Sequence, residues 1–161
     1  MSKIAIYPGT FDPITYGHID LIKRARKIFP KVIIAVAHNP HKNPLFSIEE
    51  RVSMLKKATA KLSRVEVSDF EGLVVNYARK RNAKVLIRGL RMVSDFEYEF
   101  QMALTNRKLS PDIETIFLMP HESYSYLSAK LLKEAASLGA KLNSFIPAFV
   151  EKALKNKLNN E

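Results

Sequence analysis

Residues 4–37, IAIYPGTFDPITYGHIDLIKRARKIFPKVIIAVA, contain one strand–loop–helix–strand unit. The run Ile4 to Tyr7 is apolar and rich in β-formers, and turn residues follow from Pro8 to Gly17. Helical spacing then places five apolar residues on one face: Leu21, Ile22, Ala25, Ile28 and Phe29. Pro30 ends this helix, and the continuous apolar run Val32 to Ala37 is typical of a strand buried on both faces of a parallel sheet.

The alternation of strand and helix continues to the end of the chain. Further strand-like runs lie at residues 65–67, 85–87 and 115–119, and helical patterns lie at about 48–62, 73–81, from 94, 128–138 and from 147. Such alternation predicts a parallel sheet with right-handed crossovers. We therefore expect a single-domain, Rossmann-like, doubly wound α/β fold over residues 1–161. It should have a five-stranded parallel sheet, helices on both faces and extra C-terminal helices.

Local signals indicate where several helices begin and end. Ser47 with Glu50 forms a capping box, and the stretch Ser94 to Glu97 predicts a second one. The helix after Ser94 is expected to bury four apolar side chains: Phe96, Phe100, Ala103 and Leu104. Gly139 fits the C′ position after the helix over 128–138, and Pro147 is expected to start the last helix.

The composition excludes several classes of protein. Cysteine is absent, which excludes disulfides, a thiol nucleophile and a zinc ribbon. No apolar run approaches the roughly 20 residues of a membrane span, and the N-terminus has no signal segment, so a cytoplasmic protein without a membrane partner is expected. Lys and Arg number 26 against 16 Asp and Glu, a net charge of +10 that fits nucleic acid, a membrane surface or small anions.

In a doubly wound sheet the ligand binds beyond the carboxyl ends of the strands, so the loops there should hold the chemistry. These loops are residues 8–18, 38–46, 68–74, 88–94 and 120–128. The first has neither the dinucleotide fingerprint G-x-G-x-x-G nor a P-loop. Its Gly9 would let a backbone approach a ligand closely. Gly17 and His18 open a helix, whose free N–H groups and dipole favour an anion, and the imidazole can donate to phosphate.

The segment Tyr7 to His18 resembles the T/H-x-G-H nucleotidyltransferase superfamily, with Thr15-Tyr16-Gly17-His18 as the motif. Two more stretches narrow this resemblance: Leu86-Ile87-Arg88-Gly89-Leu90-Arg91 and Ser94-Asp95-Phe96-Glu97-Tyr98-Glu99-Phe100-Gln101. With residues 46–52 and 114–120 they are similar to the bacterial phosphopantetheine adenylyltransferase family over nearly the whole chain. The resemblance implies one nucleotidyltransferase domain, residues 1–161. It also implies transfer of the adenylyl group of ATP to 4′-phosphopantetheine, which gives dephospho-coenzyme A and pyrophosphate.

Such a transfer needs positioned cations and donors rather than a general base or a covalent enzyme intermediate, because the attacking phosphate is already anionic. By the resemblance, Thr10 contacts the pantetheine phosphate and His18 stabilises charge on the α-phosphate. Lys42 is implied to bridge the reacting phosphates and Arg91 to bind those of ATP, which completes the implied catalytic set. Arg88 ends a buried strand, where an unpaired guanidinium is costly, so an anion should meet it. The resemblance makes that anion the substrate phosphate.

The resemblance also implies the remaining substrate contacts. The implied ATP-binding set is Thr10, Phe11, His18, Gly89, Leu90, Arg91, Glu99, Tyr124, Ser125, Tyr126, Leu127, Ser128, Ala129 and Lys130. The implied substrate-binding set is Thr10, Lys42, Val74 and Arg88. Glu99 would lie at the ribose and Val74 beside the pantetheine arm, although Glu99 and Lys42 also fit solvated side chains. At residues 127–130 this chain has Leu-Ser-Ala-Lys where the family has Ile-Ser-Ser-Ser, so Lys130 fits a replacement charge or a surface lysine equally well.

Two other functions are alternatives to this reaction. A sister nucleotidyltransferase, acting on nicotinamide mononucleotide or making a CDP-alcohol, would share the His18 loop but not the motifs around Arg88 and Glu99. A nucleic-acid-binding module needs cations clustered on one face, whereas here they are scattered over most helices, so no nucleic-acid partner is expected.

Metal ions, assembly and a feedback ligand are the remaining expectations. His38 and His41 lack a ligand pattern of cysteines or carboxylates, so no protein metal site is expected, and Mg²⁺ should bind through ATP. The family further implies a homohexamer, a dimer of trimers, and coenzyme A as a feedback ligand.

Overall fold

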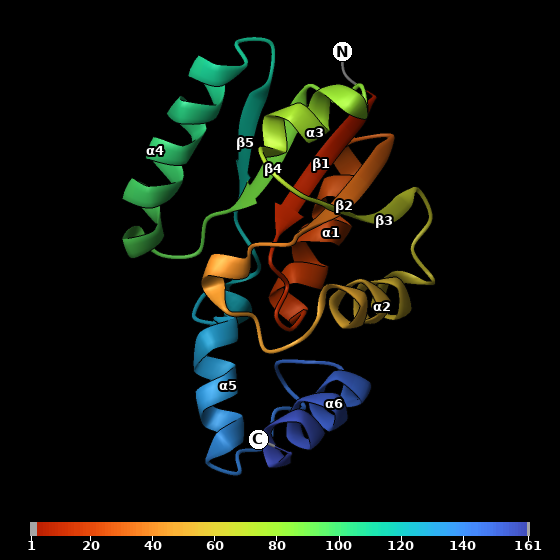
Figure 1. Cartoon of the computed structure of the whole chain (residues 1–161), viewed down its shortest axis with the longest axis vertical. Helices are drawn as coiled ribbons and strands as arrows, with labels where there is room; N and C mark the ends of the chain where they lie inside the picture. The colour runs from red at the N-terminus through yellow and green to blue at the C-terminus, as the bar shows by residue number, and fades with distance from the viewer. Residues whose placement is uncertain (1–2, 161) are drawn as a thin grey trace.

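Five parallel strands form one sheet in the order β3-β2-β1-β4-β5, with β1 at its centre (Figure 1). The strands are β1 (Ile4–Gly9), β2 (Lys31–Ala37), β3 (Val65–Phe70), β4 (Val85–Gly89) and β5 (Glu114–Leu118). The computed structural model describes residues 3–160. The chain winds outward from β1 to β3, crosses back, and winds outward again from β4 to β5. The prediction of a doubly wound, five-stranded parallel sheet is therefore confirmed.

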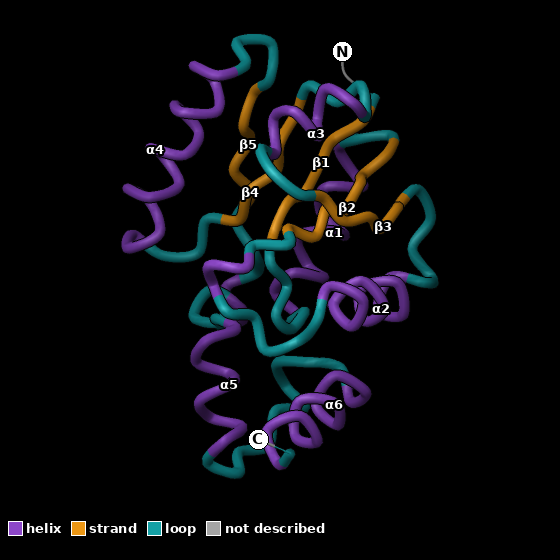
Figure 2. The backbone as a smooth tube through the Cα atoms, in the orientation of Figure 1, coloured by secondary structure: helices purple, strands orange, loops and turns teal. Residues whose placement is uncertain are grey.

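Six α-helices and two short 3₁₀ turns connect and extend the strands within residues 3–160 (Figure 2). The helices are α1 (Tyr16–Ile28), α2 (Ile48–Thr59), α3 (Val74–Lys80), α4 (Val93–Leu109), α5 (Ala129–Ser137) and α6 (Ala148–Asn159), and the turns are η1 (Pro40–Lys42) and η2 (Glu122–Tyr124). Each falls where the sequence predicts a helix or a loop. The largest boundary errors are three residues: α2 ends three residues before the expected Leu62, and β3 continues three residues beyond the expected Val67.

Each face of the sheet has its own core because successive side chains of a strand point to opposite faces. Ala5 and Ile34 belong to the core that α1, α2, α5 and α6 complete. Ile6 and Ile33 belong to the core that α3 completes. In Figure 1, α3 lies in front of the sheet and α1 behind it. The prediction that helices cover both faces is confirmed.

The starts of α1 and α2 are fixed by reciprocal capping. In α2, the Glu50 N–H donates to Oγ of Ser47 over 3.2 Å, and the Ser47 N–H donates to Oε2 of Glu50 over 2.7 Å, which confirms this capping box. The apolar face predicted for α1 is buried except at Ile28, whose side chain is 57% exposed. Ile28 is the last residue of α1, and the cap residue Phe29 that follows it is buried again.

The predictions for α4 are wrong in two respects. The cap is Asp95 rather than a Ser94–Glu97 box, because Oδ2 of Asp95 accepts the N–H groups of Arg91 and Met92. The apolar set is also not buried: Phe96, Phe100 and Leu104 are exposed, and the rings of Phe96 and Phe100 stack 5.5 Å apart on the outside. The buried residues of α4 are instead polar, Glu99 and Asn106.

The C-terminal helices α5 and α6 pack against the core that contains Ala5 and Ile34. Gly139 has a φ of +83° directly after α5, a left-handed conformation that glycine adopts without strain, so the C′ prediction is confirmed. Pro147 caps α6 as expected, and Val150 and Leu154 of α6 enter the core. Within residues 3–160, none of the helices combines the length and apolarity required to cross a membrane.

Candidate active site

A cavity of about 630 Å³ lies beyond the carboxyl ends of β1, β2 and β4. That volume is in the range of small-molecule sites. Most residues that the resemblance implies line it: Thr10, Phe11, His18, Lys42, Val74, Arg88, Gly89, Arg91, Glu99, Tyr124, Leu127, Ser128, Ala129 and Lys130. The sheet topology thus brings five loops, far apart in the sequence, to one place.

Three implied ATP contacts are not among the residues that line this cavity. Leu90 donates its N–H to the carbonyl of Leu118 and so extends the pairing of β4 with β5. Ser125 uses its hydroxyl on the carbonyl of Glu122 within the turn η2. Tyr126 is exposed, and its ring packs edge-on against that of Phe145.

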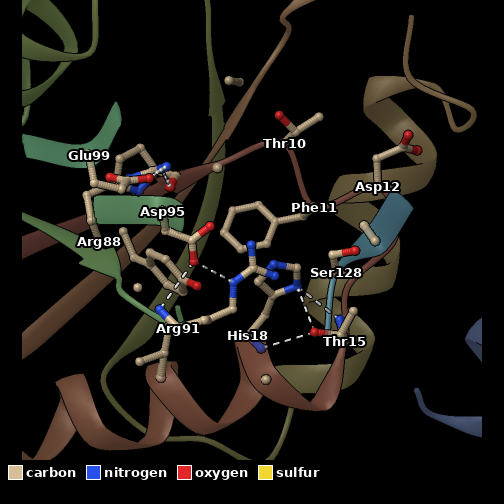
Figure 3. A pocket seen from close by; sticks show the side chains of 18 of the residues that line it. Thr10, Phe11, Asp12, Thr15, His18, Arg88, Arg91, Asp95, Glu99 and Ser128 are labelled. Atoms are coloured by element: carbon tan, nitrogen blue, oxygen red, sulfur yellow. Dashed lines mark hydrogen bonds and ion pairs between the residues drawn. The ribbon is translucent and has the colours of Figure 1, made fainter. Parts of the chain in front are cut away.

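His18 is held by the residue that caps its own helix (Figure 3). The Thr15 N–H donates to Nδ1 of His18 over 3.0 Å, and the His18 N–H donates to Oγ1 of Thr15 over 3.3 Å. The motif Thr15-Tyr16-Gly17-His18 is therefore a capping box in which histidine replaces the usual Glu or Gln. Because Nδ1 accepts a hydrogen bond, the ring proton of the neutral imidazole lies on Nε2.

The charge state of His18 follows from its surroundings. Burial lowers the pKa of His18 to about 3, and the positive charges of Arg91 and Arg88 act in the same direction. In the substrate-free protein the imidazole is therefore neutral at pH 7. It offers the cavity a fixed N–H donor without a full positive charge.

The first turn of α1 has few backbone donors left for an anion. The Tyr16 N–H donates to the carbonyl of Phe145 over 2.8 Å, and the N–H groups of His18 and Ile19 both bond to Thr15. Among these first N–H groups only that of Gly17 has no bond within residues 3–160. The predicted anion site at this helix terminus therefore depends chiefly on the His18 ring.

Gly9 lines the cavity and also makes room for a neighbouring ring. A Cβ atom at Gly9 would lie 2.9 Å from Cε2 of Phe11. The missing side chain thus allows the Phe11 ring to pack against the backbone of β1. Phe11 has a φ of +51°, and its ring packs edge-to-face against both Tyr7 and His18, with the ring centroids of Phe11 and His18 5.0 Å apart.

Arg88 meets an anion of the protein itself. Its Nε and Nη2 donate to the two carboxylate oxygens of Glu99 over 3.0 and 2.7 Å, and Nη1 donates to the carbonyl of Pro8 over 2.8 Å. Burial opposes the charge of Arg88, but the hydrogen bonds and charge of Glu99 outweigh it and raise the pKa of Arg88. Glu99 is buried, so it is no solvated helix carboxylate.

The other charges of the cavity divide into paired and free groups. Arg91 pairs with Asp95 and also donates to the carbonyl of Leu127. Lys133 pairs with Asp12 at 2.8 Å. Lys42 and Lys130, in contrast, make no ion pair within residues 3–160, and both are exposed at the cavity. These two lysines are therefore free to meet an anion.

Sequence reasoning overlooked two buried charged residues: Asp12, which lines the cavity, and Arg51, which donates to the carbonyl of Thr10 beside it. Asp12 lies in the first loop, and its position among the motif residues could have drawn attention to it. Arg51 lies on the buried face of α2 together with Met54 and Leu55. An arginine at an apolar position of an amphipathic helix was the signal that could have found it.

Metal ligands are sparse in the described part of the chain. Nε2 of His38 lies 2.7 Å from Oδ2 of Asp69 at the surface. No group of three or more His, Asp or Glu side chains within residues 3–160 is arranged to hold a metal ion.

A family model and curated proteins of known name match this chain over most of its length. Residues 6–141 match a family model described as cytidylyltransferase-like. A phosphopantetheine adenylyltransferase of Caldanaerobacter subterraneus subsp. tengcongensis is 57% identical over 155 residues, which are 96% of this chain and 97% of the relative. The protein of that name from Carboxydothermus hydrogenoformans is 51% identical over 99% of this chain and 98% of its own length.

Solved structures show the same fold. A putative nicotinate-nucleotide adenylyltransferase from Vibrio parahaemolyticus has a TM-score of 0.70 and 18% identity, with coverage of 100% of this chain and 97% of its own. A bifunctional NMN adenylyltransferase/ADP ribose pyrophosphatase from Francisella tularensis also has a TM-score of 0.70 at 18% identity, over 99% of this chain and 50% of its own. At these identities the likeness concerns the fold alone.

Proposed function

The chain belongs to the phosphopantetheine adenylyltransferases of the cytidylyltransferase-like family, and from this premise we propose that it transfers the adenylyl group of ATP to 4′-phosphopantetheine. The products are dephospho-coenzyme A and pyrophosphate, a step of coenzyme A biosynthesis. The observation that carries this proposal is relatives of one name at 51–57% identity over nearly their full length. The cavity supports it, because a fixed imidazole donor lies there with arginines and two free lysines.

The reaction is an in-line displacement at the α-phosphorus of ATP. An oxygen of the 4′-phosphate attacks, the bond to the bridging oxygen of the pyrophosphate breaks, and pyrophosphate leaves with the electron pair. The nucleophile is already anionic, so the protein contributes position and charge stabilisation. Nε2–H of His18 donates to the α-phosphate oxygens, Thr10 holds the attacking phosphate, and Lys42 bridges the reacting phosphates.

The two substrates occupy opposite parts of the cavity in this proposal. Arg91, Tyr124 and residues 127–130 hold ATP, while Val74 and Arg88 lie with phosphopantetheine. Glu99 can contact the ribose without leaving Arg88, because each carboxylate oxygen has two lone pairs and Arg88 uses one on each. The pair thus links the two halves of the cavity.

Lys130 is proposed to supply charge to the ATP phosphates where the family pattern has a hydroxyl. Oγ of Ser128 caps α5 by accepting the N–H of Leu131, so this hydroxyl is already engaged. Lys130 lines the cavity two residues later and has no ion-pair partner within residues 3–160. A free lysine at a helix N-terminus adds to the partial positive charge there.

Mg²⁺ is proposed to arrive bound to ATP. The three carboxylates that line the cavity, those of Asp12, Asp95 and Glu99, each pair with a cation of the protein. These groups do not fit a dedicated cage, and Mg²⁺ commonly uses substrate phosphates and waters as ligands. When bound in this way, the ion neutralises charge on the leaving pyrophosphate.

Self-association and feedback are proposed as further properties. The exposed apolar face of α4, with Phe96, Phe100 and Leu104, supports assembly of copies of this chain, for which a homohexamer built as a dimer of trimers is the proposed form. Coenzyme A is the product with one more phosphate on its ribose, so it is proposed as a feedback ligand of this cavity. The cytoplasm is the proposed location because the reaction consumes ATP.

A pyrophosphate-release assay tests the reaction. The protein with Mg-ATP and 4′-phosphopantetheine should release pyrophosphate, and nicotinamide mononucleotide in place of phosphopantetheine should give at least a hundredfold less. The variant His18→Ala should lower kcat by about 10²-fold or more, on the order of the loss of a preorganised donor. No release with phosphopantetheine would refute the function, and a loss below tenfold in His18→Ala would leave that residue a structural role.

A further inference from the structure

Arg51 of α2 is a buried cation whose donors all go to backbone carbonyls. Its side chain is only 2% exposed. Nε donates to the carbonyls of Phe46 and Ser47 over 3.1 and 3.3 Å. Nη1 donates to those of Thr10 and Ala37 over 2.9 and 2.8 Å, and Nη2 to that of His38 over 3.3 Å.

These five carbonyls belong to the two loops that carry Thr10 and Lys42. Ala37 and His38 are the root at which the loop over residues 38–46 leaves β2, and Phe46 and Ser47 are the root at which it enters α2. The Thr10 carbonyl belongs to the loop after β1. One guanidinium therefore fastens both roots of one loop to the other loop.

Asp12 also fastens the second root, through its carboxylate. Its carboxylate oxygens accept the N–H groups of Leu45 and Phe46, each over 2.9 Å, and it also accepts from Nζ of Lys133 on α5. Asp12 is itself buried in the first loop. Two buried charges thus join the loop after β1 to residues 38–46.

The segment between the two roots has few such contacts. Its residues 40–43 are exposed, and the turn η1 there is flanked by Asn39 and Asn43 in left-handed conformations. Lys42 lies in this exposed segment and reaches the cavity from it. The place of Lys42 relative to Thr10 is therefore set at the roots.

We propose that Arg51 is a positioning residue, which sets the distance between Thr10 and Lys42 and so builds the part of the site that receives the attacking phosphate. This inference rests on the proposed function, and it assigns Arg51 no contact with substrate. Lysine at this position keeps the charge but not the planar fork of five donors that reaches three segments at once. Arg51→Lys should therefore loosen one half of the cavity and leave the ATP half in place.

The test compares both substrates in the intact protein. Arg51→Lys should lower kcat/KM for 4′-phosphopantetheine at least tenfold and change KM for ATP less than threefold. The matched control is Arg81→Lys, which removes a guanidinium from a pair with Glu66 and Tyr77 away from the cavity. It should lower the unfolding temperature without changing either kinetic constant more than twofold.

A double-mutant comparison separates positioning from a general loss of structure. In a Lys42→Ala background, Arg51→Lys should cost at most threefold, because the residue through which Arg51 acts is already absent. Equal factors in both backgrounds, or equal losses for both substrates, would overturn the inference. If Arg51→Lys does not fold, Asp12→Asn is decisive, because it loosens the root at Leu45 and Phe46 and must show the same substrate split. A wild-type protein without activity would instead overturn the proposed function and this inference with it.

Discussion

His18 presents a neutral donor to the cavity because Nδ1 of its ring accepts a hydrogen bond from the helix cap. Thr15 donates to Nδ1, so the proton is confined to Nε2, and burial with Arg91 and Arg88 nearby keeps a second proton off the ring. A positively charged ring would have to be paired or solvated in this position. The cap and the low pKa together give the cavity a donor of fixed direction.

This charge state predicts a pH dependence of stability. The folded pKa of His18, about 3, lies below its unfolded value near 6.5, so the unfolded chain binds the extra proton between these values. The stability from the neutral ring is present above pH 6.5 and is lost as the pH falls toward 3. Relative to His18→Gln, whose side chain does not titrate, the wild type should lose at least about 1.4 kcal/mol between pH 7 and pH 4.5, the equivalent of one pKa unit.

Urea unfolding of both proteins at the two pH values measures this difference. The remaining titratable groups are common to the two proteins, so their contributions cancel. A difference that stays constant between pH 7 and pH 4.5 would show that the ring is solvated or charged in the folded protein.

Glu99→Gln should weaken the protein by leaving Arg88 with one poor acceptor in place of a bidentate carboxylate. Loss of a charge-assisted bond from a buried group costs about 1–3 kcal/mol. We expect a decrease of this size in the free energy of unfolding, measured by urea denaturation. Glu97→Gln, an exposed carboxylate on the same helix, should change it by less than about 0.5 kcal/mol. Equal effects of the two variants would contradict the role of the pair.

Lys130→Ser restores a hydroxyl at the position where the family has one, and it tests the proposed charge. We expect KM for ATP to rise about three- to tenfold, because a free cation near the phosphates is lost. Lys141→Ser, outside the residues that line the cavity, is the control. Unchanged ATP affinity and turnover in Lys130→Ser would identify it as a surface lysine.

The limits of sequence reasoning at the residue scale lie in contacts between distant segments. The resemblance named His18 and Arg88, but the carboxylate that meets Arg88 is eleven residues away on a helix whose orientation the periodicity misjudged. The partners of Asp12 and Arg51 could not be predicted, because most of them are backbone groups of other loops. Backbone N–H and C=O groups are the same at every residue, so no side-chain pattern announces such bonds.

At the scale of elements, local signals in the sequence were sufficient to predict a helix where that helix packs on the sheet. Ser47 and Glu50 predicted the start of α2 because a capping box involves only neighbouring residues. For α4 the apolar residues predicted the wrong face. Its inner side faces the polar cavity and therefore carries Glu99 and Asn106, while its phenylalanines lie outside.

The exposed outer face of α4 predicts that copies of this chain assemble through Phe96 and Phe100. Phe96→Glu combined with Phe100→Glu should shift the protein to smaller species in sedimentation velocity, because two charges would be buried without partners in an apolar contact. Gln101→Glu on the same helix adds a charge at an exposed polar position and should leave the mass unchanged. Wild type that sediments as a monomer, or a double variant of unchanged mass, would exclude this face as the interface.

At the scale of the whole molecule, the architecture followed from the order of elements alone. Five strands alternating with helices admit few chiralities and connections, so the sheet and the location of its site could be predicted without a single tertiary contact. The free charge of the cavity could not be predicted in the same way, since a net charge of +10 does not say which cations are neutralised by a partner. The structure shows that pairing removes Arg88, Arg91 and Lys133 from the free charge of the cavity and leaves Lys42 and Lys130.

Salt should therefore act on this protein chiefly through the cavity. The Debye length shortens from about 10 Å at 0.1 M salt to about 3 Å at 1 M, which screens attraction of polyanionic substrates from a distance. We expect kcat/KM for ATP to fall about fivefold over this range of potassium chloride, with a smaller change in kcat. The slope should become shallower in Lys130→Ser but not in a Lys61→Glu, Lys152→Glu variant, which alters the net charge by more at exposed sites outside the cavity. A slope that becomes shallower in the Lys61→Glu, Lys152→Glu variant than in Lys130→Ser would mean that the overall charge, rather than the two free lysines, draws the substrates in.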